Sequence, residues 1–272
     1  MKPLLIALTA CLLLVAQITF AKDQFLVVCA PSTQKNPSIQ QADKWYRDSA
    51  EKKASYRQVY NIGSAYVKQW VEQHHPKAKT WGVVLDIDET TLDNSWYFYQ
   101  CASLAEKPAE FSHFVTIPQK SIALPGVVAF TRWVHQLGGY VTLISNRDGS
   151  YTDQSGITAL RATIDNLKQQ QVTFDQVILA NNKQSHHPAD KNPRFNAVIH
   201  GCYDEHEMVW SNKLPSHQVI AYFGDNIQDF PEYKQATEYA LPEAAQQYDK
   251  FGQGYFILPN PLYGSWQANR YE

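Results

Sequence analysis

Residues 83–94 read VVLDIDETTLDN, a short apolar run that leads directly into four acidic side chains. Short apolar runs rich in valine and isoleucine are typical of strands buried on both faces, as in parallel sheets. A buried strand that ends in like charges is unusual, because those charges repel one another. The stretch therefore indicates a strand whose end carries a functional site.

Similar apolar runs recur along the chain and alternate with segments of helical length. The runs lie at residues 81–88, 140–145, 176–180 and 218–225, and the helical segments lie near 127–137, near 156–168 and around Arg194. Strands that alternate with helices in this way predict an α/β fold, with a Rossmann-like parallel sheet flanked by helices and joined by right-handed crossovers.

Polar side chains follow three of these runs. Asp86 and Asp88 end the first, the sequence SNR at 145–147 ends the second, and Asp225 ends the last. The carboxyl ends of parallel strands share one edge of a sheet, so these residues are expected to converge in one crevice. Two unit charges about 4 Å apart repel by roughly 4 kcal/mol at an effective dielectric near 20, so the cluster needs a cation. Oxygen ligands without neighbouring Cys or His favour magnesium over zinc. The alternative, that each aspartate only caps a helix or makes a turn, suits one aspartate better than three.

The segments around this sheet divide the chain into parts. Residues 22–37 are polar and contain two prolines, so they are interpreted as a linker. Residues 38–75 repeat apolar side chains every three or four positions, which predicts an N-terminal helical extension whose aromatic rings pack on the main domain. The main domain then covers 76–272, and its aromatic segment at about 95–125 is a candidate cap over the sheet edge.

The first 21 residues have the pattern of an export signal. A basic start at Lys2 is followed by an apolar run, and small residues precede Lys22. The protein is therefore expected to be exported, to the periplasm or beyond. Two alternatives stay open: the sequence LTAC at 8–11 fits a bacterial lipobox that would lipidate Cys11, and the apolar run is near the lower limit for an uncleaved membrane anchor.

Export would permit disulfides among the cysteines beyond the signal, which are Cys29, Cys101 and Cys202. We suggest that Cys101 pairs with Cys202 and that Cys29 is free. Connectivity does not follow from sequence, so buried free thiols are the alternative.

The overall charge bears on partners. The chain has 272 residues with 26 acidic and 24 basic side chains, a net charge of −2. This balance lacks the basic footprint of proteins that bind nucleic-acid polymers. A small-molecule substrate is expected, and the oligomeric state is not indicated.

These motifs together resemble the haloacid dehalogenase (HAD) superfamily, subfamily IIIB, and within it the bacterial class C acid phosphatases, which include lipoprotein 5′-nucleotidases. The matching stretches keep the family's order from about residue 81 to the C-terminus: DIDETTLDNS from 86, LPG at 124–126, SNR at 145–147 with SG at 155–156, KNPRF at 191–195, GDNIQDF at 224–230 and YFILPNPLYGSW at 255–266.

The resemblance implies a phosphomonoesterase that uses two aspartates in sequence. Asp86 would be the nucleophile that forms an aspartyl-phosphate. Asp88 would protonate the leaving group and then activate water, and a protonated Asp88 in the free enzyme would suit an acidic pH optimum. One Mg²⁺ would bind the Asp86 carboxylate, the Asp88 carbonyl and Asp225.

The resemblance also implies supporting roles. Ser145 would bind a phosphate oxygen, and Lys191 would neutralise charge that develops during transfer. Asp229, Asn146 and Arg147 would be outer partners of these groups. Asn94 and Ser95 are expected to close the turn after the first motif and to touch phosphate.

The lysine assignment has a rival. Lys183 also lies between the second and last motifs, but Lys191 precedes Pro193-Arg194-Phe195 with the family's spacing. Lys191 is therefore the expected catalytic lysine.

Two aromatic rings hold the substrate base in the family. Tyr263 matches the ring of the C-terminal tail. Phe111 matches the ring of the cap only with a one-residue insertion and with Phe in place of Trp. The alternative is that both rings are simply buried under the cap.

The leading hypothesis is an exported, Mg²⁺-dependent acid phosphatase acting on phosphomonoesters, with nucleoside 5′-monophosphates as candidates. The alternatives are a phosphotransferase with the same intermediate and a non-catalytic binding or storage protein on this scaffold. A DxD glycosyltransferase would give no reason for the later motifs. The histidine pairs at 74–75 and 186–187 precede prolines in expected loops and are interpreted as solvated.

Overall fold

The structure is a computed structural model that describes residues 37–100, 108–117 and 121–270. Its centre is a six-stranded sheet with the order β6-β5-β4-β1-β7-β8. All neighbouring strands run parallel except β6, which is antiparallel to β5. The strands of this sheet are β1 (Trp81–Asp86), β4 (Tyr140–Asp148), β5 (Gln176–Ala180), β6 (Met208–Trp210), β7 (Gln218–Gly224) and β8 (Tyr255–Ile257).

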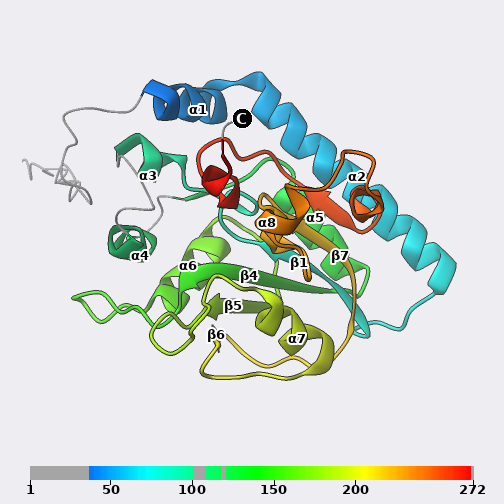
Figure 1. Ribbon diagram of the computed structural model, residues 1–272. Coiled ribbons are helices and arrows are strands. Elements are labelled where there is room, and N and C mark those ends of the chain that lie inside the picture. Colours follow the sequence, from blue (N-terminus) through cyan, green and yellow to red (C-terminus); the bar gives the residue numbers. More distant parts are fainter. Residues whose placement is uncertain (1–36, 101–107, 118–120, 271–272) are drawn as a thin grey trace, which may run out of the picture.

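Helices cover both faces of this sheet (Figure 1). The longer helices are α1 (Pro37–Asp48), α2 (Ala50–His74), α4 (Pro108–Thr116), α5 (Val127–Gln136), α6 (Ala159–Gln169) and α7 (Asn192–His200). The short ones are α3 (Ser95–Gln100), η1 (Ile227–Asp229), α8 (Gln235–Glu238), η2 (Gln246–Lys250) and η3 (Ser265–Ala268). The α/β class predicted from the alternating runs is confirmed, with one antiparallel edge strand added.

The two faces of β1 belong to two hydrophobic clusters. Val83 and Leu85 pack in the larger cluster with residues of α2, α5 and α6. Val84, between them, packs in the other cluster with Phe195 and Val198 of α7. Successive side chains of a strand point to opposite faces, so a continuous apolar run is what a strand covered on both sides requires.

Strand β1 lies in the sheet between β4 and β7, which both come much later in the sequence. Asp86 pairs with Ile144 of β4, and Leu85 pairs with Phe223 of β7. The connections diverge to the two sides of β1, so a crevice opens at its carboxyl end. The sheet therefore sets the place of the site before any side chain is considered.

The expected cap segment at about 95–125 contains α3, α4 and β3 (Ile122–Ala123), and β3 pairs antiparallel with β2 (Leu92–Asp93) just before the segment. Figure 1 shows α3 and α4 together on the α1 side of the molecule, beyond the end of the sheet. The helical spacing of residues 38–75 corresponds to α1 and α2.

Several sequence-based expectations fall outside the described residues. These are the export signal, Cys11, most of the linker, Cys29 and Cys101. Cys202 is exposed and has no disulfide partner among the described residues, so its suggested pairing with Cys101 stays a prediction. Within the described residues, no helix is both long enough and apolar enough to span a membrane.

Candidate active site

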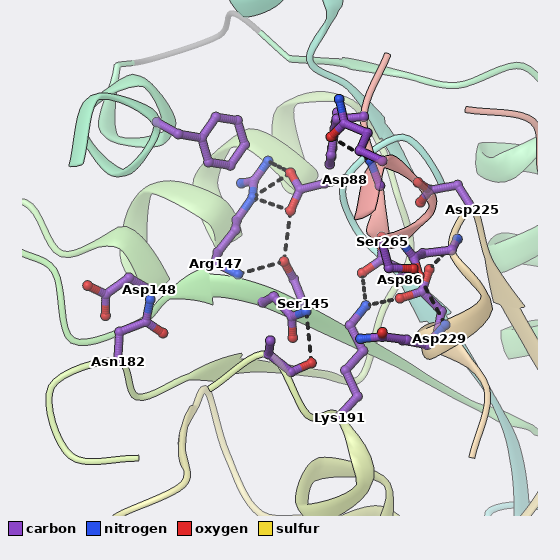
Figure 2. Close-up of a pocket in the computed structure, with 18 of the residues that line it drawn as sticks. Asp86, Asp88, Ser145, Arg147, Asp148, Asn182, Lys191, Asp225, Asp229 and Ser265 are labelled. Atoms are coloured by element: carbon purple, nitrogen blue, oxygen red, sulfur yellow. Dashed lines mark hydrogen bonds and ion pairs between the residues drawn. The ribbon is translucent and has the colours of Figure 1, made fainter. Parts of the chain in front are cut away.

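Carboxylates from two neighbouring strands meet at the carboxyl edge of the sheet. Asp86 ends β1, Asp225 follows β7, and Asp229 lies one helical turn later in η1. One carboxylate oxygen from each lies within 4.8 Å of the others. All three line a cavity of about 440 Å³ that Asp88 also lines, as Figure 2 shows. The four acidic residues named from sequence are thus brought together.

Lys191 sits between two of these carboxylates. Its Nζ donates to Asp86, and it lies 2.6 Å from Oδ1 of Asp229. The lysine immediately precedes α7, where Pro193 is in the first turn, and its side chain is only 3% exposed. Burial alone would lower the pKa of Lys191, but the two carboxylates outweigh it, and the pKa is raised. The rival Lys183 is exposed in the loop after β5.

Asp88 has a different environment from Asp86, although it is only two residues away. Its carboxylate accepts hydrogen bonds from Nε of Arg147 at 2.9 Å, Oγ of Ser145 at 2.8 Å and Nδ2 of Asn94 at 2.7 Å. Burial would raise its pKa, but the charge and hydrogen bonds of Arg147, with those of Ser145 and Asn94, lower it. These three donors favour the ionised form of Asp88, whereas the expectation from sequence is a protonated Asp88 in the free enzyme.

The second motif contributes more to Asp88 than sequence suggested. Ser145 is fully buried, donates its hydroxyl proton to Asp88 and accepts from the backbone N–H of Arg147 at 3.0 Å. Arg147 is also anchored at its far end, since Nη1 donates to Thr163 of α6 at 3.0 Å. Both residues line the cavity, so Ser145 remains adjacent to any bound group while it orients Asp88.

Asn146 lines the cavity, and two hydrogen bonds fix its side-chain amide. Its Nδ2 donates to the carbonyl of Ala189 at 3.2 Å, and its Oδ1 accepts from Nη2 of Arg194. Arg194, in α7, is 1% exposed, and its Nη2 also donates to the Pro188 carbonyl at 3.2 Å. Arg194 thus ties the second motif to the loop before Lys191, a function that the motif KNPRF did not reveal.

Asp225 is oriented by side chains from two distant segments. Oγ1 of Thr90 donates to its Oδ1 at 2.9 Å, and Nδ2 of Asn260 donates to its Oδ2 at 2.8 Å. The pKa of Asp225 is raised by burial and then by the nearby carboxylates of Asp229 and Glu89. The pKa of Asp86 is raised chiefly by burial as well, although Lys191 opposes this.

Asp229 closes the turn that carries Asp225. Its Oδ2 accepts from the backbone N–H of Asn226 at 2.8 Å, and its other oxygen accepts from Lys191. Gly224 permits this arrangement, because a Cβ there would lie 2.2 Å from Cβ of Asp229. Because Gly224 has no side chain, the carboxylates of Asp225 and Asp229 can lie close together.

The aromatic residues proposed as a base clamp line the same cavity. Phe111, on α4, packs edge-on against Tyr97 with ring centroids 5.2 Å apart. Tyr263 stacks on Phe98 at 4.8 Å and donates its hydroxyl to the carboxylate of Glu89. Phe98, not Phe111, is thus the ring against Tyr263.

Glu89 is fully buried and was not singled out as a site residue from sequence. Burial, and then the charge of Asp88, raise the pKa of Glu89 to about 8. Its Oε1 accepts from the backbone N–H of Asn94 at 2.7 Å. Glu89 therefore joins Tyr263 in the tail to Asn94, which holds Asp88.

The donor set fits a hard divalent cation. Asp86, Asp225 and Asp229 offer only oxygen atoms, and one oxygen of each lies within 4.8 Å of the others, close enough for a single cation to contact them. Burial and mutual repulsion raise the pKa of both Asp86 and Asp225, so additional positive charge beside Lys191 would stabilise their ionised forms. Asp229 already uses both oxygens, on Lys191 and Asn226, which suits an outer position better than direct coordination.

The comparisons with known proteins agree with this geometry. A family model described as HAD superfamily, subfamily IIIB (Acid phosphatase), matches residues 17–266. This chain belongs to that family of acid phosphatases. Two solved structures of the class C acid phosphatase from Bacillus anthracis, one with tungstate bound, are similar to this HAD subfamily IIIB chain. Each has 27% identity and a TM-score of 0.65 and covers 85% of this chain, and the alignments cover 88% of the tungstate-bound chain and 87% of the other.

Membership in the subfamily IIIB acid phosphatases assigns phosphomonoesterase activity to this chain, with a small phosphomonoester as the substrate. HAD enzymes generally use a divalent metal, and the acidic cluster lies where one would bind. The resemblance drawn from the sequence motifs is therefore confirmed at the level of the family, the fold and the class of reaction.

Proposed function

We propose that this acid phosphatase is exported, depends on Mg²⁺ and hydrolyses phosphomonoesters, with nucleoside 5′-monophosphates among them, through a phosphoryl group carried on Asp86. The observation that carries the proposal is the buried Asp86 carboxylate, paired with Lys191 and lying beside Asp225, with Asp88 two residues away. A nucleophile next to a cation and an acid–base group is what phosphoryl transfer through a covalent intermediate requires.

In the first half-reaction an oxygen of Asp86 attacks phosphorus, and the bond to the leaving oxygen breaks. Lys191 offsets negative charge on the Asp86 side of the transferring group. Asp86, the Asp88 carbonyl and Asp225 would hold the divalent cation, which supplies Lewis-acid stabilisation of the phosphoryl oxygens when bound. Asp88 delivers a proton to the leaving alkoxide, and in the second half-reaction it removes one from water.

The ionised state of Asp88 has a consequence for the source of that first proton. The second pKa of a phosphate monoester is about 6, so below that pH the substrate is a monoanion that carries its own proton. Asp88 can accept this proton and pass it to the leaving oxygen without being protonated in the free enzyme. An acidic optimum then follows from the substrate.

The tungstate complex of the Bacillus anthracis relative supports an oxyanion site. Tungstate is a tetrahedral oxyanion like phosphate, and we expect it to compete with substrate here. The proposal of nucleotide preference rests on Phe111 and Tyr263 lining the cavity that contains Asp86.

The proposed export rests on residues 1–21 and is tested separately by mass spectrometry of the mature chain. A start at Lys22 would support a cleaved export signal, a start at Cys11 would support the lipidated form, and retention of Met1 would contradict cleavage of the signal.

The decisive experiment follows phosphate release at acidic pH, with and without Mg²⁺, from the wild type and Asp86→Asn. Acid-quenched protein is digested, and the peptide that contains Asp86 is examined for one added phosphoryl group. We expect release and the adduct in the wild type only. Release by Asp86→Asn, or an adduct on another residue, would contradict the assignment. Adding a small alcohol separates hydrolysis from phosphotransfer, because transfer would yield a new phosphate ester.

A further inference from the structure

Helix α2 contacts the loop that joins β1 to the cap, residues 87–94, which we call the catalytic loop. Two tyrosines one helical turn apart donate their hydroxyls to its backbone. Oη of Tyr56 lies 2.5 Å from the carbonyl oxygen of Glu89, and Oη of Tyr60 lies 2.8 Å from that of Thr90. Residues four apart lie on the same face of a helix, so both reach the same loop.

A third contact comes from the preceding turn of the same helix. Nζ of Lys52 lies 2.7 Å from Oδ2 of Asp93, and both side chains are more than nine-tenths buried. The other oxygen of Asp93 accepts from the backbone N–H of Ser95 at 2.8 Å, at the start of α3. Lys52 also lies 4.2 Å from the centre of the Tyr46 ring. The ion pair therefore links α2 to both the catalytic loop and the cap.

Packing alone does not explain these polar groups. Tyr56 and Tyr60 are 0% and 2% exposed, and phenylalanine would fill most of the same space without burying a hydroxyl. Burying a hydroxyl or an ammonium is costly unless it is paired. The loop needs such donors because its backbone is irregular, with Glu89 at φ +55. The carbonyl groups of Glu89 and Thr90 accept hydrogen bonds from the tyrosine hydroxyls and not from a neighbouring strand.

The two residues whose carbonyls accept these hydrogen bonds are themselves linked to the aspartates of the site. The residue whose carbonyl binds Tyr60 is Thr90, and its Oγ1 donates to Asp225. The residue whose carbonyl binds Tyr56 is Glu89, and its carboxylate fixes Asn94, which in turn donates to Asp88.

The attachment of α2 to the sheet is also close. A Cβ on Gly63 would lie 2.5 Å from the Phe223 ring, so only glycine allows the helix to approach β7 this far. Phe223 stacks on Tyr60 with ring centroids 5.5 Å apart and precedes Asp225 by two residues. The helix therefore contacts β7 near its end and the loop that follows β1.

We propose that α2 is a positioning element of the active site. Tyr60 orients Asp225 through Thr90 and so affects cation binding, whereas Tyr56 and Lys52 hold the part of the loop that orients Asp88 and so affect turnover. This proposal rests on the roles given to Asp86, Asp88 and Asp225 above.

The test compares Tyr56→Phe, Tyr60→Phe and Lys52→Met with Tyr66→Phe, a control on the same helix whose ring packs on Phe256. Binding of Mg²⁺ alone is measured by calorimetry on the mature chain, and kcat and KM are measured at saturating Mg²⁺. The loss of one hydrogen bond corresponds to about a 3- to 10-fold effect.

We expect Tyr60→Phe to weaken Mg²⁺ binding by that factor. Tyr56→Phe and Lys52→Met should lower kcat by about 10-fold with KM little changed, and Lys52→Arg should restore part of the loss. Tyr66→Phe should match the wild type. The tyrosine variants suffice if Lys52→Met does not fold.

Variants that lose only thermal stability, with wild-type kcat and Mg²⁺ affinity at temperatures where they are folded, would overturn the proposal. Asp86→Asn separates this outcome from failure of the proposed function. If Asp86→Asn is inactive but the α2 variants have wild-type kcat and Mg²⁺ affinity, only the positioning role of α2 is refuted. If Asp86→Asn is active, the proposed mechanism itself is refuted.

Discussion

Arg147 and Asp88 form a partly buried ion pair through two nitrogen atoms: Nε and Nη2 of the arginine lie 2.9 Å and 2.8 Å from Oδ1 of the aspartate. A guanidinium held in this way stabilises the carboxylate, not the carboxylic acid. Asp88 is therefore set up as a base that receives its proton during the reaction.

Arg147→Met should raise the pKa of Asp88, because the largest group that lowers it is removed. The ionised form then exists only at higher pH, so the acidic limb of the kcat/KM profile should move to higher pH. We also expect kcat to fall by about 10- to 100-fold. The measurement is a pH–rate profile, with Arg132→Met, an exposed arginine of α5, as the control. An unmoved acidic limb would show that Arg147 does not govern the titration of Asp88.

The alkaline limb of the profile should follow the substrate. If the monoanion supplies the first proton, activity falls as pH rises through the second pKa of the phosphate, which is about 6. Esters whose second pKa values differ should then shift the limb by matching amounts. If the alkaline limb lies at the same pH for all esters, a group of the enzyme, and not the substrate, supplies the first proton.

Lys191→Met should lower kcat by about 100- to 1,000-fold, since it removes the cation that contacts Asp86. The variant also leaves Asp86 and Asp229 without their buried partner, so its Tm should fall. Lys183→Met, at an exposed position, should retain wild-type activity. Steady-state kinetics and thermal melts measure both effects, and the reverse pattern of activities would reassign the catalytic lysine.

Phe111→Ala tests the aromatic wall of the cavity. If the ring stacks on the base, KM for nucleoside 5′-monophosphates should rise by about 10-fold, because stacking contributes about 1–3 kcal/mol per base. KM for a small alkyl phosphate should stay unchanged and acts as the control. Equal effects on both substrates would instead indicate a packing role against Tyr97.

His217 should make the fold less stable in acid. Its Nδ1 lies 2.8 Å from the carbonyl oxygen of Pro215, its buried Nε2 has no hydrogen-bond partner among the described residues, and its pKa is lowered by burial. Below a pH of about 6.5 the unfolded chain takes up a proton that the folded chain resists, so stability falls as pH decreases.

His217→Phe removes this dependence, and its Tm should change less between pH 7 and pH 5 than the Tm of the wild type. His186→Gln, at an exposed position, is the matched control and should keep the wild-type slope. Equal slopes for His217→Phe and the wild type would exclude His217 as the source.

The acidic centre could be predicted because it depends on simple geometry. Asp86 and Asp225 end neighbouring parallel strands, and a parallel sheet brings such ends together whatever the connections do. The same rule placed Ser145 beside them, since β4 is the other neighbour of β1.

The partners of these residues were harder to predict, because they come from segments whose positions periodicity does not determine. Helical spacing identified the inward face of α2 but not the loop carbonyls opposite Tyr56 and Tyr60, so only packing was expected there. Asn260 reaches Asp225 from the tail after β8, a three-residue strand too short for a pattern. β6 is equally short, which is why the antiparallel edge was missed.

Gly224 has no side chain, and this matters for any attempt to graft the acidic site onto another protein. Any other residue would push Asp229 away, and the lysine that Asp229 holds would lose one of its two anchors. An engineer who grafts these carboxylates onto another sheet must therefore include the glycine as part of the site, although it contributes no functional group.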